Sequence, residues 1–553
     1  MTVPIDAAAP PPTRASALES LRGGTVDLLV IGGGATGCGL ARDAALRGLR
    51  VALVEREDVA SGTSSRSSRL VHGGVRYLEQ GALGLVFEAS AERRRLLRLA
   101  PHLVRPLEFT WPVYEGARVP TWKLAAGLTL YDLLALFRNV GRHRRLDASD
   151  VLAREPRLRG DGLRGGASYW DAATDDARLT LATAMDASRA GAVVLTHASV
   201  TALVRDTERV VGARVHDLIG GESFDVRARV VVNATGPWSD QVRSLDPAEG
   251  GTRATVRGSK GAHIAVPRER VGNTGALTLI VPSDGRVFFV LPSGPMTIID
   301  TTDTDSAAAP EAVRASRADV DYLLAAANAY FTEARLVSAD VVSAWAGVRP
   351  RAAQAGIRGS APSGASREHA IVSGPGGMIS VTGGKLTTYR AMAAELADAV
   401  ERALGHAPTR SPTSDRPLPG GQLDDPEVAV RAATSITGDA SVARRLVQAY
   451  GSEWSQLWRT CMADDVGRSR LDPGLPYLAG ELRWGVSHEL ALTLGDLLIR
   501  RVPVAFERRD HAVALAARAA EIVAPLLGWD DERATIEIER YRAEAERMFG
   551  IEE

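Results

Sequence analysis

The first clear hydrophobic pattern in the chain is a short apolar run at residues 28–31 that stops abruptly at a group of glycines. A run of this length is too short for a helix, so it predicts a strand buried on both faces. Residues 35–47 have the pattern of a helix, and residues 50–54 predict a second buried strand. This order of strand, glycine turn, helix and strand is typical of a dinucleotide-binding unit.

The glycine turn carries Gly32, Gly34 and Gly37 at GxGxxG spacing. The first glycine allows a tight turn, the second lets the backbone approach a pyrophosphate, and the third lets the helix pack closely on the sheet. The helix directs its N-terminal N–H groups and positive dipole end at the phosphates. Glu55 follows the second strand, where a carboxylate can accept both ribose hydroxyls of an adenosine. The pattern predicts a dinucleotide site without separating FAD from NAD.

The next segment, residues 60–81, is unusually rich in Ser, Thr, Gly and Arg. Hydroxyls and free N–H groups at this density suit a loop that runs along an anionic cofactor, and Gly73 and Gly74 allow close approach to a flat ring. A solvated serine loop is the alternative. The position of the segment directly after the dinucleotide turn favours the cofactor.

Helical patterns follow at residues 85–99 and 122–137, and the second is strongly apolar and precedes the basic string RNVGRHRR. An apolar helix beside a basic cluster can lie on an anionic membrane surface. An ordinary core helix with a solvated basic end has the same pattern. Both interpretations stay open.

Later segments alternate strand and helix patterns, and an apolar strand at 227–232 runs into Ala234 and Gly236. Short strands separated by turns at residues 255–303 predict an antiparallel sheet. A helix is expected to start after Gly384. Beyond this helix a Pro- and Gly-rich linker leads into a helical pattern that continues to the end of the chain.

Composition narrows the class of protein. The 553 residues allow about two to four domains, with 45% hydrophobic and 24% charged residues. A net charge of −1 offers no general attraction to nucleic acid, and we find no zinc-finger spacing and predict no metal site. Two distant cysteines exclude a disulfide framework, and no apolar run is long enough to span a bilayer. Residues 1–24 predict a disordered tail and lack a signal peptide, so we expect a cytoplasmic protein.

Longer strings are more specific than the glycine turn. They are TSSRSSRLVHGGVRYLE at 63–79, DDARL at 175–179, NATGPW at 233–238, GVRP at 347–350 and GGKLTTYR at 383–390. In these strings and their order the chain resembles the FAD-dependent glycerol-3-phosphate dehydrogenases, a family within the flavoproteins shaped like D-amino-acid oxidase. The likeness continues through 475–501 and covers nearly everything from Val26 onward.

The resemblance implies a mixed α/β and α+β fold. It has a Rossmann-like, discontinuous FAD-binding domain, an antiparallel-sheet substrate domain and an all-α C-terminal domain. The expected FAD-binding segments are 25–80, 150–240 and 345–410, and the interleaved substrate domain is 81–149 and 241–344. A linker at 411–425 and a helical domain at 426–553 follow. The strand that returns at Ala234 favours FAD over NAD.

The same resemblance implies residues that hold FAD, which we expect to be noncovalent. They are Gly32, Gly34, Ala35, Thr36, Gly37, Glu55, Arg56, Thr63, Ser64, Ser65, Ser68, Leu70, His72, Gly73, Gly74, Val200, Ala234, Gly236, Trp238, Gly384, Lys385, Leu386 and Thr387.

Oxidation of a secondary alcohol needs a base near the hydroxyl and cations that hold a phosphate and a developing alkoxide. By resemblance, Arg349 and Arg367 form a phosphate clamp, although either arginine can instead pair with a carboxylate. His263 is the candidate base, because an imidazole with a pKa of about 6.5 accepts a proton near neutrality. A lone histidine is also often structural.

Three further residues complete the expected site. Lys385 is expected near flavin N1 or N5, where its ammonium stabilises the reduced ring or caps a carbonyl. Arg76 and Tyr77 are candidates for the substrate side. The chain departs from the family's pattern in two places: Ala262 replaces the usual serine before His263, and Asp300 stands where relatives often have glycine.

The resemblance implies oxidation of sn-glycerol 3-phosphate to dihydroxyacetone phosphate by hydride transfer to flavin N5, with electrons passed to a quinone in glycerol catabolism. One alternative is an oxidase that reduces O₂ to peroxide, although we find no extra insertion of the kind such relatives tend to carry. Another is a flavin-binding sensor or scaffold without catalysis. Peripheral contact with the inner face of the cell membrane and a homodimer are left open.

Overall fold

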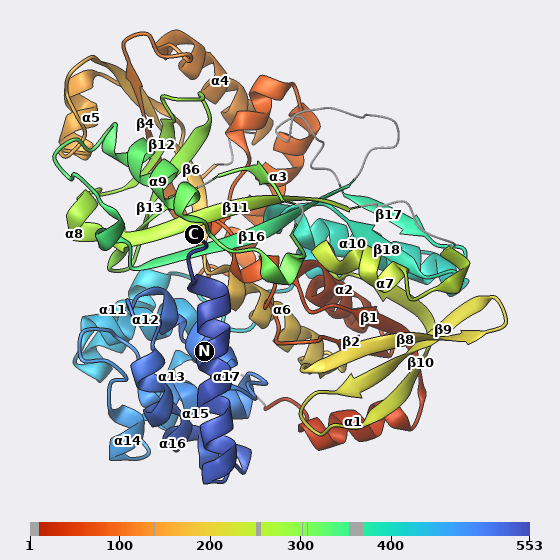
Figure 1. Cartoon of the computed structure of the whole chain (residues 1–553). Coiled ribbons are helices and arrows are strands. Elements are labelled where there is room, and N and C mark those ends of the chain that lie inside the picture. Colours follow the sequence, from red (N-terminus) through yellow and green to blue (C-terminus); the bar gives the residue numbers. More distant parts are fainter. Residues whose placement is uncertain (1–9, 137–138, 250–255, 301, 307, 353–368) are drawn as a thin grey trace.

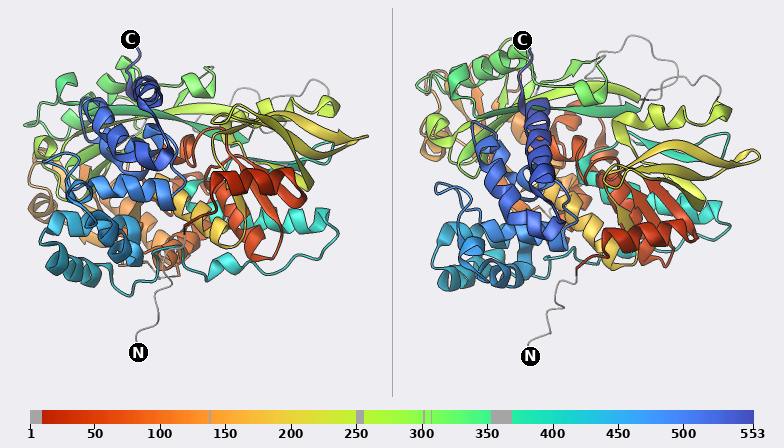
Figure 2. Two further views of the ribbon diagram at one scale, coloured as in Figure 1. Left: turned by 90° about the horizontal axis from the view of Figure 1, so that it is seen from below. Right: turned by 60° about the horizontal axis from the view of Figure 1, so that its bottom comes forward.

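The computed structural model describes residues 10–136, 139–249, 256–300, 302–306, 308–352 and 369–553. Two β-sheets with flanking helices lie side by side, and a group of C-terminal helices packs beside the first sheet and below the second in the orientation shown (Figure 1). Two further views agree on this arrangement (Figure 2). The mixed fold predicted from the sequence, with its helical C-terminal domain, is confirmed.

The first sheet is built from separate parts of the chain. Its strands are β1 (Thr25–Ile31), β2 (Val51–Val54), β7 (Val193–Leu195), β8 (Ala198–Asp206), β9 (Arg209–Asp217), β10 (Ser223–Asn233), β17 (Ala370–Ser373) and β18 (Ile379–Thr382). The core order is β18-β10-β1-β2-β7 with parallel neighbours, while β17, β9 and β8 add antiparallel edges. The parallel strands end together, which leaves their carboxyl ends on one side.

Strand β1 is covered on both faces, as its unbroken apolar run predicts. Leu28 and Val30 pack into a core shared with α2 (Ala35–Leu46), α6 (Asp176–Arg189) and α10 (Tyr389–Ala403). Leu29 and Ile31 face the opposite way and pack with α1 and β9. The alternation follows the two-residue period of a strand.

Helix α1 (Arg14–Arg22) corrects one prediction, because we expected all of residues 1–24 to be disordered. The Thr13 side chain accepts from the N–H of Ser16 and caps the helix, while Ala17 and Leu21 are buried against the first sheet. The Arg14 guanidinium donates to the carbonyl of Thr196 at 2.7 Å. Two buried residues in an Ala-rich stretch give too weak a period to identify the helix from sequence.

The second sheet is antiparallel apart from the β4–β12 pair. Its strands are β3 (Leu70–Val71), β4 (Val104–Tyr114), β5 (Arg144–Leu146), β6 (Leu163–Thr174), β11 (Val256–Pro267), β12 (Ala276–Ile280), β13 (Val287–Ser293), β14 (Met296–Asp300), β15 (Thr304–Asp305) and β16 (Ser343–Ala352). Strands β3 and β6 lie in segments that we assigned to the FAD-binding domain, and β16 crosses the boundary at 345. The boundaries drawn at 80, 150 and 345 therefore do not follow the division between the sheets.

The remaining helices fall into two groups. Those around the sheets are α3 (Leu83–Leu99), α4 (Thr121–Leu134), α5 (Ala148–Arg154), α7 (Ser239–Arg243), α8 (Arg268–Val271) and α9 (Arg317–Asn328). Those of the C-terminal domain are α11 (Pro426–Thr437), α12 (Ala440–Tyr450), α13 (Trp454–Cys461), α14 (Asp465–Arg468), α15 (Ala479–His488), α16 (Ala516–Leu527) and α17 (Asp531–Phe549). Within the described ranges, none of these helices combines the length and apolar content needed to traverse a bilayer.

Buried ion pairs join the C-terminal domain to the loop after β2. Asp58 accepts from Arg500 Nε at 2.6 Å and from Arg501 NH2 at 2.9 Å, and all three side chains are buried. Arg500 also donates a hydrogen bond to Asp496. The other carboxylate oxygen of Asp496 is hydrogen-bonded to His197 Nε2 at 2.9 Å. Removing one partner of a buried pair leaves an uncompensated charge, so this cluster fixes the position of the two domains.

Candidate active site

A cavity of about 490 Å³ lies between the two sheets. The first sheet contributes the turns after β1, β2, β10 and β18, and the second contributes residues of β11, β13 and β16. The segment rich in hydroxyls, residues 61–77, forms much of the remaining wall. Ligands of parallel α/β sheets bind at this edge, outside the carboxyl ends of the strands.

The glycine turn is shaped for close approach of the backbone. Gly32 has a φ of +109°, and a Cβ there would lie 2.8 Å from the carbonyl oxygen of Ala234. A Cβ on Gly37 would lie 1.9 Å from the carbonyl oxygen of Gly32. Gly37 therefore packs the helix against the turn, as expected for the third glycine, and it does not line the cavity.

Glu55 lies beside this turn with both carboxylate oxygens engaged. Oε2 accepts from the N–H of Gly33 at 2.6 Å, and Oε1 accepts from the N–H of Glu57 at 2.9 Å. Burial raises the pKa of Glu55, and these two N–H groups oppose that rise. Each oxygen retains a further lone pair, so the carboxylate can still accept hydroxyl donors from a ligand in the cavity.

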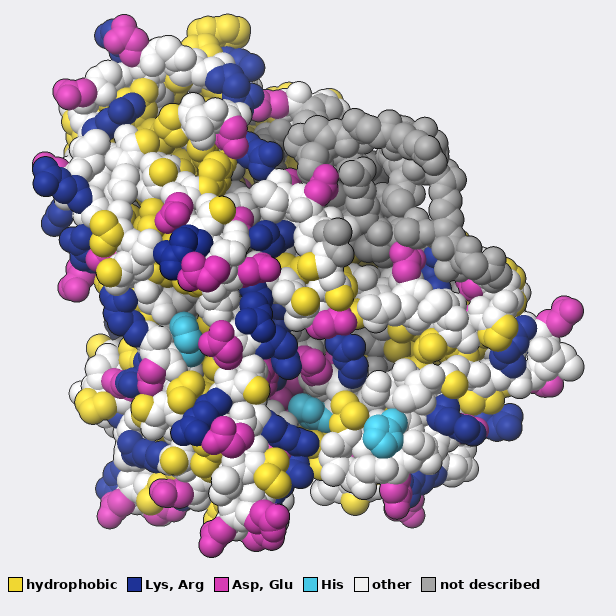
Figure 3. Space-filling model, viewed as in Figure 1, with side chains coloured by type: hydrophobic (Ala, Val, Ile, Leu, Met, Phe, Trp, Pro, Cys, Tyr) yellow, Lys and Arg dark blue, Asp and Glu magenta, His cyan; other side chains and the backbone are white. Residues whose placement is uncertain are grey.

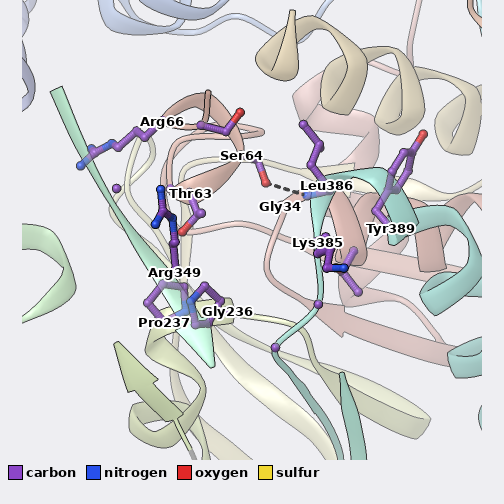
Figure 4. Close-up of a pocket in the computed structure, with 18 of the residues that line it drawn as sticks. Gly34, Thr63, Ser64, Arg66, Gly236, Pro237, Arg349, Lys385, Leu386 and Tyr389 are labelled. Carbon is purple, nitrogen blue, oxygen red and sulfur yellow. Dashed lines mark hydrogen bonds between the residues drawn. The ribbon is translucent and has the colours of Figure 1, made fainter. Parts of the chain in front are cut away.

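The first helical turn of α2 meets the hydroxyl-rich loop. Ser64 Oγ accepts from the N–H of Ala35 at 3.0 Å, and Figure 4 shows this serine directed at the turn that carries Gly34. Thr63 Oγ1 donates to the carbonyl of Val348 at 2.7 Å and ties the loop to β16. The turn therefore presents hydroxyl and N–H groups to the cavity at a helix N-terminus, which is a favourable site for phosphate.

Two expected cofactor residues of this loop stand behind the cavity wall. Ser65 is buried, and its hydroxyl donates to the carbonyl of Gly62. The N–H of Gly73 donates to Asp171 Oδ1 at 2.9 Å, and a Cβ on Gly73 would lie 2.2 Å from the hydroxyl oxygen of Tyr131. Both residues shape the wall and do not line the cavity. The other expected cofactor residues, Gly37 excepted, line it.

The segment after β18 forms the opposite wall. Gly383 and Gly384 both have positive φ, and Lys385 follows with its Nζ 4.0 Å from the centre of the Tyr77 ring. The Thr387 hydroxyl accepts a hydrogen bond from the backbone N–H of His72 and donates one to the His72 carbonyl, both at 3.2 Å. Helix α10 begins at Tyr389 and not at Lys385, because a short 3-10 turn, Leu386–Thr388, comes first.

His263 lies on β11 and faces the cavity. Its Nε2 is 3.4 Å from Ser68 Oγ, and its ring stacks on Trp345 with centres 5.4 Å apart. Burial, together with the positive charges of Arg349 and Arg69, lowers the pKa of His263 to about 3. The imidazole is therefore neutral at physiological pH and able to accept a proton. Ser68 brings a hydroxyl to this histidine although Ala262 lacks one.

Arg349 reaches the same end of the cavity from β16. Its NH1 lies 3.4 Å from Asp303 Oδ1 and 3.4 Å from the carbonyl oxygen of Thr302. Figure 4 shows Arg349 beside Thr63 and Gly236, with Lys385 on a separate segment of the wall.

The structure gives less information on two of the expected substrate residues, Arg76 and Arg367. Arg76 stands in the 3-10 segment Val75–Gln80, directly before the cavity-lining Tyr77. Arg367 lies outside the described residues, so its predicted position in the phosphate clamp stays a prediction.

Several cavity residues escaped the sequence analysis. None of them was predicted individually, and most are aromatic or charged side chains on strands and in the loop after β2: Glu57, Arg66, Ser67, Phe109, Tyr169, Asp171, Val287 and Phe289. The alternation in RVFFVLP is a signal for Phe289, since one of two adjacent phenylalanines must face inward. Phe109, Tyr169 and Asp171 gave no such signal, because their strands were not predicted.

These residues fit a long flavin dinucleotide. Glu55 offers acceptors for a ribose, the start of α2 with Ser64 offers donors for a pyrophosphate, and Lys385 and His263 line the same cavity. The glycines of the turn leave space that a Cβ would fill. The donor set therefore fits the adenosine, the pyrophosphate and the flat ring of FAD.

Comparison with known proteins agrees with this arrangement. Residues 27–390 match the family model described as FAD dependent oxidoreductase, and residues 411–534 match the one described as C-terminal domain of alpha-glycerophosphate oxidase. The chain is 39% identical over 549 residues to glycerol-3-phosphate dehydrogenase 2 of Mycobacterium tuberculosis, covering 98% of this chain and 91% of that protein. It is 36% identical to the human mitochondrial glycerol-3-phosphate dehydrogenase, covering 96% of this chain and 75% of that protein.

A solved structure extends this similarity to three dimensions. The crystal structure of the glycerol-3-phosphate dehydrogenase from Bacillus halodurans, complexed with FAD, superimposes with a TM-score of 0.78 at 32% identity. The match covers 97% of each chain.

Proposed function

The chain belongs to the FAD-dependent glycerol-3-phosphate dehydrogenase family, and from this premise we propose that it oxidises sn-glycerol 3-phosphate to dihydroxyacetone phosphate and passes the electrons to a quinone. One observation carries the proposal. A neutral imidazole, a guanidinium and an ammonium, those of His263, Arg349 and Lys385, line one cavity from three separate segments of the chain. Bound FAD supplies the acceptor for the hydride at N5.

We propose that different residues around the cavity bind different parts of FAD, without a covalent bond. Glu55 would accept the ribose hydroxyls, and the N–H groups at the start of α2, with the Ser64 hydroxyl, would bind the pyrophosphate. Thr387 and Lys385 would hold the pyrimidine end of the ring. The Thr387 contacts with His72 keep these two walls of the cavity in register.

The substrate phosphate binds to Arg349. A guanidinium stays charged at every physiological pH and can grip two phosphate oxygens at once. The contacts of NH1 with Asp303 and the Thr302 carbonyl hold the guanidinium in one orientation. We propose Arg367 as a second member of this clamp.

The neutral Nε2 of His263 then accepts the proton of the substrate hydroxyl while the carbon-bound hydrogen leaves as hydride. The Lys385 ammonium offsets the negative charge that develops in the site. The cation–π contact of this ammonium with the Tyr77 ring holds the positive charge in place.

Anaerobic mixing of the FAD-loaded protein with glycerol 3-phosphate tests the proposal. Loss of the flavin absorbance near neutral pH is the expected result, and 2-hydroxy acids or amines are expected to leave the spectrum unchanged. A flavin that no substrate bleaches contradicts the proposal and favours a sensor or scaffold.

Because residues 411–534 match a domain named for an oxidase, the same reaction is then run in air. Peroxide equal to the substrate consumed favours the oxidase, whereas reduction of a quinone analogue without peroxide rejects it.

We propose that the quinone is reached at a membrane surface on the inner face of the cell membrane. Large apolar side chains on α3, on α4 and just after it are exposed: Leu83, Phe87, Trp122, Leu133 and Leu136. Trp122 is 72% exposed. Figure 3 shows apolar atoms protruding at the upper edge of the molecule, over α4. Arg144 and Arg145 follow on an exposed strand, and apolar and basic groups together favour an anionic lipid surface.

A further inference from the structure

A buried carboxylate faces His263 from the neighbouring strand. Asp300 on β14 stands directly opposite His263 on β11, with Oδ2 3.8 Å from Nε2. The two side chains are 0% and 2% exposed. A carboxylate removed from water is stabilised by a positive neighbour, and the His263 imidazole becomes one when it takes up a proton.

Asp300 shares the face of the sheet that looks onto the cavity. Residues directly opposite each other in antiparallel strands project from the same face. Asp300 is opposite Phe289 as well as His263, and both of these residues line the cavity. Asp300 thus belongs to a row across β16, β11, β14 and β13, in which Trp345 stacks on the other side of His263.

Two arginines among the described residues place positive charge near His263. Arg349 from β16 and Arg69 from the loop before β3 both disfavour a protonated imidazole. Each has its own carboxylate, because Asp303 lies 3.4 Å from Arg349 and Glu507 interacts with Arg69. A proton accepted by His263 therefore enters a site held by two guanidinium groups. Asp300 is the carboxylate placed to offset it.

We propose that Asp300 is a positioning residue that orients the His263 imidazole and stabilises the imidazolium formed when Nε2 takes the hydroxyl proton. This inference rests on the proposed function. The O–H bond of the substrate breaks and an N–H bond forms at Nε2, while the hydride pair leaves the carbon for the FAD that serves as oxidant. Asp300 itself keeps its charge throughout and exchanges no proton.

Asp300→Asn, which removes the charge and keeps the size, is the first test. At saturating glycerol 3-phosphate, we expect anaerobic flavin reduction to slow by about tenfold to a hundredfold, a part of what a general base contributes. The substrate concentration at half-saturation and the FAD content are expected to stay near the wild type. Asp321→Asn on the exposed face of α9 is the matched control.

Three further measurements separate this role from packing. Asp300→Glu restores part of the rate, and in a His263→Asn background Asp300→Asn has no additional effect on it, since the carboxylate acts through the imidazole. The ring nitrogen shifts of His263 in labelled protein, measured at neutral pH, change in the Asp300→Asn variant and keep their wild-type values in Asp321→Asn. Asp300→Gly, which leaves no amide behind, replaces Asp300→Asn if the latter does not fold.

A variant that lacks the carboxylate, reduces flavin within about twofold of the wild type and keeps the wild-type ring nitrogen shifts of His263 contradicts the inference. A wild-type protein whose flavin glycerol 3-phosphate does not bleach contradicts the proposed function instead. The ring nitrogen shifts of His263 are measured without substrate, so they test the Asp300 pairing in either case.

Discussion

The N–H of Gly33 donates a 2.6 Å hydrogen bond to Glu55 Oε2, so the acid expected to bind ribose also braces the glycine turn. Two parts of the dinucleotide fingerprint therefore act on each other directly. A charged acceptor makes a stronger hydrogen bond than a neutral one.

Glu55→Gln is expected to weaken FAD binding. The amide carries no charge, and its single NH₂ group must face one of the two N–H donors, that of Gly33 or that of Glu57, so one of these hydrogen bonds is lost. Loss of a hydrogen bond to a charged group costs about 1.5–3 kcal/mol, which corresponds to roughly a tenfold to hundredfold rise in the FAD dissociation constant. Fluorescence titration of the flavin-free protein measures it. Glu208→Gln in the exposed β8–β9 turn is the control, and equal affinities in the two variants would contradict the assignment.

Arg349→Lys keeps the positive charge and removes the fork of donors. We expect KM for glycerol 3-phosphate to rise by about tenfold or more while FAD content is unchanged, because an ammonium cannot grip two phosphate oxygens in a plane. Gly261→Ala tests the same point without touching the arginine. A Cβ there would lie 2.7 Å from Arg349 NH2, so the guanidinium must shift and KM should rise. Initial rates with an artificial acceptor suffice, and an unchanged KM in both variants would exclude Arg349 from the clamp.

Asp58→Asn should destabilise the fold. Arg500 and Arg501 are buried around this carboxylate, and removal of one partner of a buried ion pair typically costs about 3–5 kcal/mol. Thermal unfolding of the flavin-free protein measures the change. Asp415→Asn, which breaks the exposed pairs with Arg98 and Arg410, is the control and should leave the midpoint unchanged. Similar midpoints for both variants would show that the buried cluster adds nothing to stability.

His102 is expected to make the protein sensitive to acid. Burial, with Arg178 and Arg105 nearby, lowers the pKa of His102 to about 3. Between that value and the ordinary 6.5, the unfolded chain binds a proton that the folded chain excludes, so stability falls as pH drops below 6.5. The loss is about 1.4 kcal/mol per pH unit. Unfolding at pH 7.5 and 5.5 should therefore show a smaller difference for His102→Asn than for the wild type. The exposed His406→Asn is the control and should follow the wild type.

The sequence predicted the parts of the fold whose signals are local. Strand β1, the glycine turn and helix α2 each have a pattern that needs no distant partner, and they were found within a few residues of their true ends. Strands β4 and β6 were missed. Strand β4 carries Pro106 and Pro112, which argue against a strand, and β6 carries Gly165 and Gly166.

The candidate site was predictable wherever a string of residues carries the chemistry, as around His263, Arg349 and Lys385. Relationships across strands were not. No local pattern indicates that Ser68 lies 3.4 Å from His263, 195 positions away, or that Asp300 stands opposite that histidine. Such pairs depend on strand register, which only the assembled sheet defines.

The exposed apolar side chains of α3 and α4 give the last prediction. Trp122→Ser and Leu133→Ser together should abolish most binding to vesicles of anionic lipid, because apolar burial at the interface drives such binding. Activity with a water-soluble acceptor should be unchanged, since neither residue lines the cavity. Sedimentation with vesicles measures binding, and Val428→Ser on the exposed face of α11 is the control. Retained vesicle binding together with a change from dimer to monomer would instead assign this apolar surface to contact between two copies of the chain.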